Sequence, residues 1–237
     1  MAKRKAPASS AKNLRLYQKS YKGGARKDSH FVVFEEARKL IGVGATKVLY
    51  PGCHRHLTAS LVFPSLTYID CDAKVGPLYE EPAAVQYVGD IKIYEEESSM
   101  EFFCADVNNG KKEPMKSLDK DYDLLISLSA GLLAEPCTPH IKTGGWLLVN
   151  DSHSDASSVF VNCKDDWELK AYWDDEHSQF AVDEMSLSRC FLAIDKKTKG
   201  EAALTRAQLQ ECISVGAISK RSFRMPFAPM FYLFQRK

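Results

Sequence analysis

The chain has 237 residues, of which 45% are hydrophobic, and a formal net charge of +1. This composition is sufficient for a buried core and excludes a disordered chain, while the charge offers no general attraction to nucleic acid or to anionic membranes. No apolar run approaches the roughly 20 residues that a membrane helix needs, and the basic N-terminus lacks the apolar segment of a secretory signal. We therefore expect an intracellular protein, in the cytoplasm or, given the basic N-terminus, in the nucleus.

The seven cysteines are scattered along the chain and include no Cys-x-x-Cys pair. An odd, scattered set argues against a disulfide framework and against a structural zinc site, and favours a reducing compartment. Residues 1–28 are rich in lysine and arginine and poor in apolar residues. They predict a flexible, solubilising arm that becomes ordered only near its end, with a nuclear-import signal or a nucleic-acid arm as alternatives.

From residue 30 onward, short apolar runs alternate with longer helical or polar segments. Residues 30–40 have helical spacing of apolar side chains and end before Gly42 and Gly44. The predicted strands are residues 46–50, 66–69, 101–105, 123–128 and 146–149, and the predicted helical segments are residues 57–63, 83–96 and parts of 132–141. This alternation is typical of a parallel sheet that is buried on both faces, and so predicts an α/β fold with a doubly wound sheet.

The last third of the chain has a different pattern. Residues 205–213 form an amphipathic helix with Thr205 as candidate N-cap. Residues 218–223 and 230–234 are predicted strands close enough to pair with each other in antiparallel fashion. Residues 152–203 are predicted to be an insertion with strands of its own near residues 167–173 and 190–194. Earlier in the chain, residues 142–145, KTGG, are expected to form a turn before the strand at residues 146–149.

Residues 48–58, VLYPGCHRHLT, together with the acid at Asp70, resemble the cofactor-binding motif of class I S-adenosylmethionine-dependent methyltransferases. Residues 121–127, DYDLLIS, and residues 141–148, IKTGGWLL, resemble the fourth strand of that family and the turn and fifth strand that follow. The resemblance covers about residues 30–151 and 203–237. It implies a mostly parallel, seven-stranded sheet with helices on both faces and an antiparallel last strand, here residues 230–234.

The resemblance also implies a cofactor, S-adenosylmethionine, and the residues that hold it. Asp70 falls where the family places the acid that binds the ribose hydroxyls, and Asp106 where it often contacts the adenine amine. The full set of expected cofactor-binding residues is Tyr50, Gly52, Cys53, His54, Asp70, Cys71, Asp106 and Ser129. The chain departs from the family in having His54 and His56 where two further glycines belong, and Tyr50 where an acid is usual. Two imidazoles in this turn would either fill the cofactor's space or push the cofactor outward.

In methyl transfer the protein mainly orients the cofactor and the acceptor. A base is needed only where the acceptor must lose a proton. Asp151 and His153, just beyond the fifth strand, are the candidates for that base. Together with His54, His56 and Asp155 they could also form a metal site. The fourth strand ends without the carboxylate that a magnesium site of this family would use, so the sequence predicts no metal.

Residues 165–184 combine many acidic residues with four interleaved aromatic residues. Such a segment suits a cationic or apolar methyl acceptor and would repel a phosphate backbone, or it is a solvated acidic face. The sequence thus favours a methyltransferase that acts on a small molecule or a protein side chain. A nucleic-acid methyltransferase and a non-catalytic protein that retains the fold are the alternatives, and the oligomeric state and the acceptor are not indicated.

Overall fold

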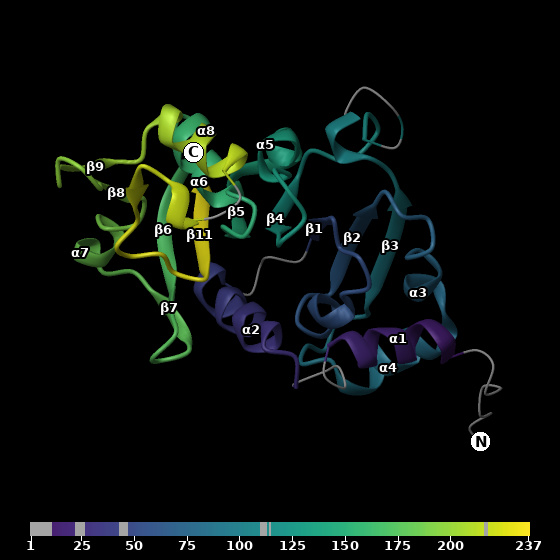
Figure 1. The fold of residues 1–237 in the computed structure, drawn as a ribbon. Coiled ribbons are helices and arrows are strands. Elements are labelled where there is room, and N and C mark those ends of the chain that lie inside the picture. Colours follow the sequence, from purple (N-terminus) through teal and green to yellow (C-terminus); the bar gives the residue numbers. More distant parts are fainter. Residues whose placement is uncertain (1–10, 22–26, 43–46, 110–112, 114, 216–217) are drawn as a thin grey trace, which may run out of the picture. The chain divides into compact units, whose positions relative to one another are not determined.

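The structure, a computed structural model, describes residues 11–21, 27–42, 47–109, 113, 115–215 and 218–237. It divides into two compact units, residues 1–118 and residues 119–237. Figure 1 shows the first unit in purple to teal and the second in teal to yellow. Among the helices of the described residues, none is long and apolar enough to cross a membrane.

The first unit is built on three parallel strands in the order β3-β2-β1. Its elements in chain order are α1 (Lys12–Ser20), α2 (His30–Ile41), β1 (Lys47–Pro51), the 3₁₀ helix η3 (Leu57–Leu61), β2 (Ser65–Asp70), α3 (Pro77–Glu80), α4 (Pro82–Ile91), β3 (Ser99–Cys104) and the 3₁₀ helix η4 (Val107–Asn109). The interior residues of β1 and β2 are buried without alternation, which is the pattern of parallel strands covered on both faces. Helix α2 buries Phe31, Phe34 and Ala37, the residues whose spacing predicted it.

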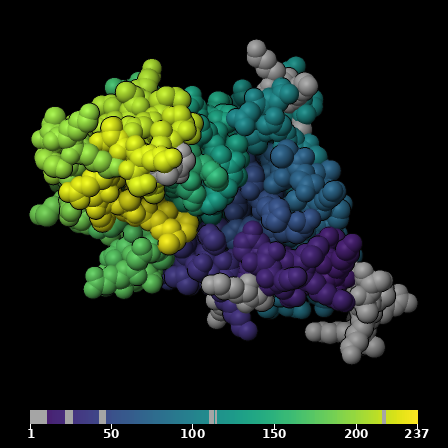
Figure 2. Space-filling view, viewed as in Figure 1, coloured from purple at the N-terminus to yellow at the C-terminus, as the bar shows by residue number. Residues whose placement is uncertain are grey.

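Helix α1 lies within the segment that was expected to be a flexible arm, and for residues 11–21 that expectation is wrong. Leu14 and Tyr17 are buried, and Figure 2 shows this purple segment lying on the blue residues of the same unit. The Glu81 side chain accepts hydrogen bonds from the backbone N–H groups of Asn13 (3.3 Å) and Leu14 (2.8 Å). These are N–H groups of the first turn, which have no partner inside the helix. A carboxylate from a distant part of the chain therefore caps α1.

The second unit has five strands in the order β4-β5-β11-β6-β7. Its elements are β4 (Tyr122–Ser127), α5 (Ala134–Cys137), the 3₁₀ helix η5 (Thr138–His140), β5 (Ile141–Asn150), α6 (Asp155–Asn162), β6 (Trp167–Asp174), β7 (Gln179–Ala181), α7 (Glu184–Leu187), β8 (Leu192–Asp195), β9 (Glu201–Ala203), α8 (Arg206–Ser214), the 3₁₀ helix η6 (Ile218–Lys220), β10 (Phe223–Arg224) and β11 (Phe231–Arg236). β4 and β5 are parallel, whereas β11 is antiparallel to both β5 and β6. Strands β10, β8 and β9 form a separate small sheet.

The predicted α/β class with a mostly parallel sheet is confirmed. Each unit follows its half of the strand order of a doubly wound sheet, and the last strand, β11, is antiparallel as expected. The described residues form eight strands in these two sets rather than seven, and the additional strand is the short β7. Thr205 caps α8 as predicted, in a reciprocal capping box with Gln208.

Three expectations for residues 142–237 were corrected by the structure. The segments at 218–223 and 230–234 do not pair with each other, since β10 pairs with β8 while β11 lies between β5 and β6. A strand is present at the expected residues 167–173, as β6, but it pairs with β11 in the sheet of the second unit rather than with strands of an insertion. Residues 142–145 form part of β5 rather than a turn, with Gly144 at a φ of +78° and an irregular register against β4. A side chain at Gly145 would meet Ile141 Cγ2 at 2.6 Å and the Lys142 carbonyl at 2.8 Å, so the strand requires glycine there.

The cap on α1 can be tested with Glu81→Ala. We expect the variant to lose about 1 kcal/mol of unfolding free energy, because two N–H groups of α1 lose their acceptor. Amide hydrogen exchange of residues 12–20 should become faster, since α1 would separate from the unit more often. Glu80→Ala is the matched control, because Glu80 is exposed and adjacent. Equal exchange rates in the two variants would contradict the role of Glu81.

Candidate functional site

The turn after β1 is the first part of the site. Gly52 has a φ of +62° and His54 a φ of +45°, so the chain reverses through two left-handed residues. Glycine adopts this conformation without strain, and histidine adopts it more readily than most residues. The His54 side chain is exposed. The backbone of this turn therefore retains the shape that a glycine-rich turn would give, although His54 replaces a glycine.

Asp70, the last residue of β2, holds this turn in place by hydrogen bonds. One carboxylate oxygen accepts the His54 N–H at 2.8 Å, and the other accepts the Asp72 N–H at 2.9 Å. From α3, the Tyr79 hydroxyl donates to the His54 carbonyl at 2.8 Å. A carboxylate has about four acceptor positions, so each oxygen of Asp70 can still accept from a ligand hydroxyl. Asp70 is thus both a structural acceptor and a fitting partner for a vicinal diol.

His56 does not lie in the expected cofactor space, and this corrects the expectation that it would obstruct a ligand. Its imidazole is only 3% exposed, with Nδ1 2.7 Å from the Tyr50 hydroxyl and Nε2 2.7 Å from Asp28 Oδ2. Burial lowers the pKa of His56, so the ring is neutral. Because Asp28 can only accept when ionised, Nε2 carries the hydrogen and Tyr50 donates to Nδ1. The Tyr21 ring stacks on the imidazole at a centroid distance of 4.4 Å.

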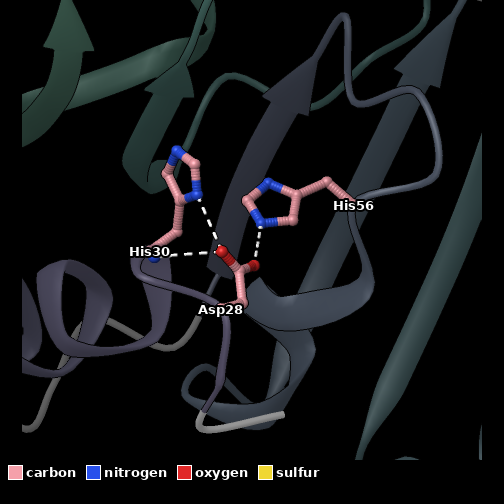
Figure 3. A group of neighbouring side chains, drawn as sticks. All are labelled: Asp28, His30 and His56. Atoms are coloured by element: carbon pink, nitrogen blue, oxygen red, sulfur yellow. Dashed lines mark hydrogen bonds and ion pairs between the residues drawn. The ribbon is translucent and has the colours of Figure 1, made fainter. Parts of the chain in front are cut away.

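Asp28 is the centre of this buried network. Figure 3 shows the two imidazole rings of His30 and His56 directed toward its carboxylate from different sides. His30 Nδ1 lies 2.9 Å from Oδ1, and the Thr58 hydroxyl donates to Oδ2 at 2.5 Å. Burial alone would raise the pKa of Asp28, but the hydrogen bonds from His30, His56 and Thr58 outweigh it and hold the pKa well below its usual range. Asp28 is therefore an ionised, buried carboxylate.

The other expected cofactor residues of the first unit are placed as follows. The Tyr50 hydroxyl bonds to His56, and Tyr50 is buried at the end of β1. Cys53 is also buried, and its N–H donates to the Ile69 carbonyl at 3.4 Å. Cys71 and Asp106 are exposed, and Asp106 Oδ1 accepts the Asn108 N–H at 3.0 Å. The structure thus brings Gly52, His54 and Asp70 together.

In the second unit, Ser129 follows β4 and is held to the end of β5. Its N–H donates to Asn150 Oδ1 at 3.0 Å, and Asn150 Nδ2 donates to the Ser129 hydroxyl at 2.8 Å. Ser129 has a φ of +54° and is exposed. The carboxyl ends of parallel strands are the edge at which open α/β sheets bind ligands. Ser129 and Asn150 form a rigid polar platform at that edge.

Asp151, one candidate base, also lies at that edge. Its carboxylate accepts from the N–H and the hydroxyl of Ser157, both at 2.8 Å, and burial raises its pKa despite these bonds. His153 is exposed. The neighbouring Asp155 is buried, accepts from the Ser127 hydroxyl at 2.5 Å, and has a pKa raised by burial to about 6. A carboxylate whose pKa is raised toward neutrality is better suited to remove a proton near pH 7.

Two cavities open on this edge of the second unit, on either side of residues 228–229. The first, of about 410 Å³, is lined by Asp151 and by the cationic side chains of Arg221 and Arg224, with apolar residues such as Met230. The second, of about 430 Å³, is lined by Tyr172, Trp173, Phe227 and the acidic residues 174–176. The first favours an anionic or polar group and the second a cationic one.

The sequence did not indicate the roles of Asp28, His30, Thr58 and Arg221. Asp28 and His30 stand at alternate positions before a helix, which is a local signal for helix capping rather than for contact with residue 56. Their meeting with His56 is a tertiary contact across 26 to 28 residues of chain, and the spacing of apolar residues carries no information about it.

No known protein family matches the sequence, and no curated protein matches it. Among solved structures, the plantazolicin methyltransferase BpumL in complex with SAH is similar over 98% of this chain and 91% of its own, with 12% identity and a TM-score of 0.45. A methyltransferase from Geobacter sulfurreducens matches over 70% and 85%, with 7% identity and a TM-score of 0.43. Precorrin-6y C5,15-methyltransferase from Geobacter metallireducens matches over 90% of each chain, with 10% identity and a TM-score of 0.41. The assignment of the fold rests on the strand order rather than on these likenesses.

The neutral state of His56 predicts a pH dependence of stability. Below about pH 6.5 the unfolded chain takes up a proton at residue 56 while the folded protein resists it, so this residue costs stability as the pH falls, by up to about 1.4 kcal/mol per pH unit. The raised pKa of Asp155 acts in the opposite direction between about pH 6 and pH 4, because the folded form protonates first. The difference between wild type and His56→Gln isolates the first effect. Chemical denaturation at pH 7.5, 6.5 and 5.5 should show a smaller loss in His56→Gln than in wild type.

His153→Gln is the control for that series, because it removes an exposed histidine. It should keep the wild-type pH dependence. A His56→Gln profile parallel to that of wild type would show that folding does not lower the pKa of His56.

Proposed function

We propose that this chain binds S-adenosylmethionine at the turn after β1 and transfers its methyl group to a small molecule or a protein side chain. The observation that carries the proposal is the arrangement of Gly52 and Asp70. A left-handed turn with glycine follows the first parallel strand, and a carboxylate with spare acceptor positions ends the next strand. This pairing suits a ligand with a ribose diol.

The residues of the turn fit the cofactor in two further respects. The His56 side chain is buried in the Asp28 network, and the His54 side chain is exposed. The two histidines that replace glycines therefore leave the inside of the turn open. Arg55 Nε is buried and has no hydrogen-bond partner among the described residues, while its Nη1 lies 3.0 Å from His54 Nε2. A buried guanidinium N–H without a partner favours an anionic ligand group, and the methionine carboxylate of the cofactor is such a group.

When bound, S-adenosylmethionine supplies an electrophilic methyl group, and the protein supplies orientation and exclusion of water. We assign the acceptor to the edge of the second unit that carries Asp151 and the two cavities. Asp151 would accept the proton of an acceptor whose nucleophile is protonated. The acidic and aromatic cavity favours an acceptor with a cationic or apolar part, as the sequence of residues 165–184 indicated.

The cofactor site is tested by calorimetric titration with S-adenosylhomocysteine on wild type and on Asp70→Asn. We expect micromolar binding by wild type, which corresponds to about −8 kcal/mol. In Asp70→Asn one acceptor oxygen becomes a donor, so affinity should fall by at least about tenfold, the cost of one lost charged hydrogen bond. The asparagine oxygen can still accept the His54 N–H, so the turn should persist.

Asp72→Asn is the matched control, because it makes the same charge change two residues away on an exposed side chain. It should bind as wild type does. A folded wild type that does not bind at millimolar ligand would reject the enzyme and leave the non-catalytic alternative.

The assignment of the base is tested once a methyl acceptor is known from a screen. Asp151→Asn should lower kcat by about 10²-fold or more, with S-adenosylhomocysteine affinity unchanged. Asp166→Asn, an exposed acid of the same unit, should retain full kcat. An unchanged kcat in Asp151→Asn would leave Asp151 with only its structural bonds to Ser157.

A further inference from the structure

We propose that Asp28, His30 and His56 form a binding site for a divalent transition-metal ion of the zinc class. The three residues lie in the first unit, and the proposal does not depend on the cofactor or on methyl transfer. Each residue offers one ligand atom, and these atoms lie within 4.8 Å of one another. Figure 3 shows that both rings present a nitrogen to the carboxylate.

The set of ligand atoms has the chemistry that zinc prefers. Two imidazole nitrogens and one carboxylate oxygen, with water in the fourth position, form a common tetrahedral set. Bonds of about 2.0–2.2 Å place two ligand atoms about 3.3 Å apart on one ion. Here His56 Nε2 and Asp28 Oδ2 are 2.7 Å apart, and His30 Nδ1 and Asp28 Oδ1 are 2.9 Å apart. These two contacts use different oxygens of Asp28, and the three ligand atoms lie within 4.8 Å of one another. A tetrahedral site therefore needs each of these pairs to open by about half an ångström and the wider separations to close toward about 3.3 Å. His30 is the ligand best able to move, because its side chain is 28% exposed.

The ionisation states already suit a metal. Coordination needs an ionised carboxylate and neutral imidazoles, so any group that must first lose a proton weakens binding. Asp28 is surrounded by hydrogen-bond donors from His30, His56 and Thr58, the arrangement that suits an ionised carboxylate. The same contacts that hold Asp28 without a metal therefore keep it in the form that binds one.

The ligands are also oriented by a second layer of contacts. His56 Nδ1 lies 2.7 Å from the Tyr50 hydroxyl, which can accept the ring hydrogen once Nε2 binds the ion. The Thr58 hydroxyl and the His30 N–H, at 2.5 Å and 3.1 Å, hold one oxygen of Asp28 each. Such outer contacts fix the tautomer and the ring orientation of metal ligands.

A bound ion would join the start of α2, which follows Asp28, to the residue that replaces a glycine in the turn after β1. Three protein ligands leave one position open, and the partial exposure of His30 gives a route from solvent. In the second unit, the exposed His177 and the half-buried Asp174, 2.6 Å apart, offer only two ligands, so this pair would bind a metal weakly. This pair supplies the control for adventitious binding.

The test is titration of chelator-treated, full-length protein with Zn²⁺ by calorimetry, with Co²⁺ as a spectroscopic probe. We expect one Zn²⁺ per chain and a visible Co²⁺ spectrum typical of tetrahedral nitrogen and oxygen ligands. His30→Gln should weaken Zn²⁺ binding by at least tenfold and abolish the tetrahedral Co²⁺ spectrum. Glutamine is close in size at a partly exposed position, so this variant should fold, and its circular dichroism must match that of wild type.

His177→Gln is the control, because this histidine is exposed and outside the site. The variant should bind Zn²⁺ as wild type does. Wild type that binds no Zn²⁺, or equal affinity in wild type and His30→Gln, would overturn the proposal. Loss of binding in His177→Gln alone would identify the metal as an adventitious surface ion and would also overturn it.

Discussion

The carboxylate of Asp28 is the constraint on which the first unit depends. A buried carboxylate is costly unless it is fully hydrogen-bonded, and the partners of Asp28 come from two separate places in the chain, residue 30 and residues 56–58. His30 begins α2, and His56 belongs to the turn after β1. Thr58 lies in η3, and its hydroxyl is also hydrogen-bonded to the Tyr17 hydroxyl of α1 at 2.9 Å. Breaking one of these bonds leaves a buried charge short of a partner, so the helices and the turn are held together as one arrangement.

The same constraint explains why the turn departs from a glycine-rich pattern. His56 would be out of place in an open, ligand-facing turn, but as a neutral ring it bridges Tyr50 and Asp28 and is covered by Tyr21. Tyr50, which stands where the resembled family has an acid, is then the donor that completes the histidine. Tyr50 and His56 therefore explain each other: a histidine at position 56 needs a hydrogen-bond donor, and the tyrosine at position 50 supplies it.

The sequence predicted those features that follow from local periodicity and failed on those that follow from tertiary pairing. The buried runs of β1, β2 and β4 and the helical spacing of α2 are visible in a window of a few residues, and so is the Thr205 cap. The pairing partners of β11 cannot be seen in such a window. Residues 218–223 lie close to β11 in the chain and so favoured a hairpin between the two, but β11 pairs with β5 and β6 instead. For the same reason Gly52 and Asp70 could be predicted from a motif, whereas Asp28 could not: its partners are fixed by how α2 docks.

Asp70 links the order of the turn to its capacity to bind. Its carboxylate already accepts the N–H groups of His54 and Asp72, so a diol bound to the remaining lone pairs would share the acceptor that keeps the turn in place. A ligand that binds only the folded turn stabilises it by RT ln(1 + [L]/Kd), about 2.7 kcal/mol at a hundredfold excess over Kd. Conversely, the Asp28 network orders the turn from the inside and reduces the entropy that a ligand must overcome. Substitutions at Thr58 or Tyr17, which leave Asp70 unchanged, should therefore weaken binding by making the turn less ordered.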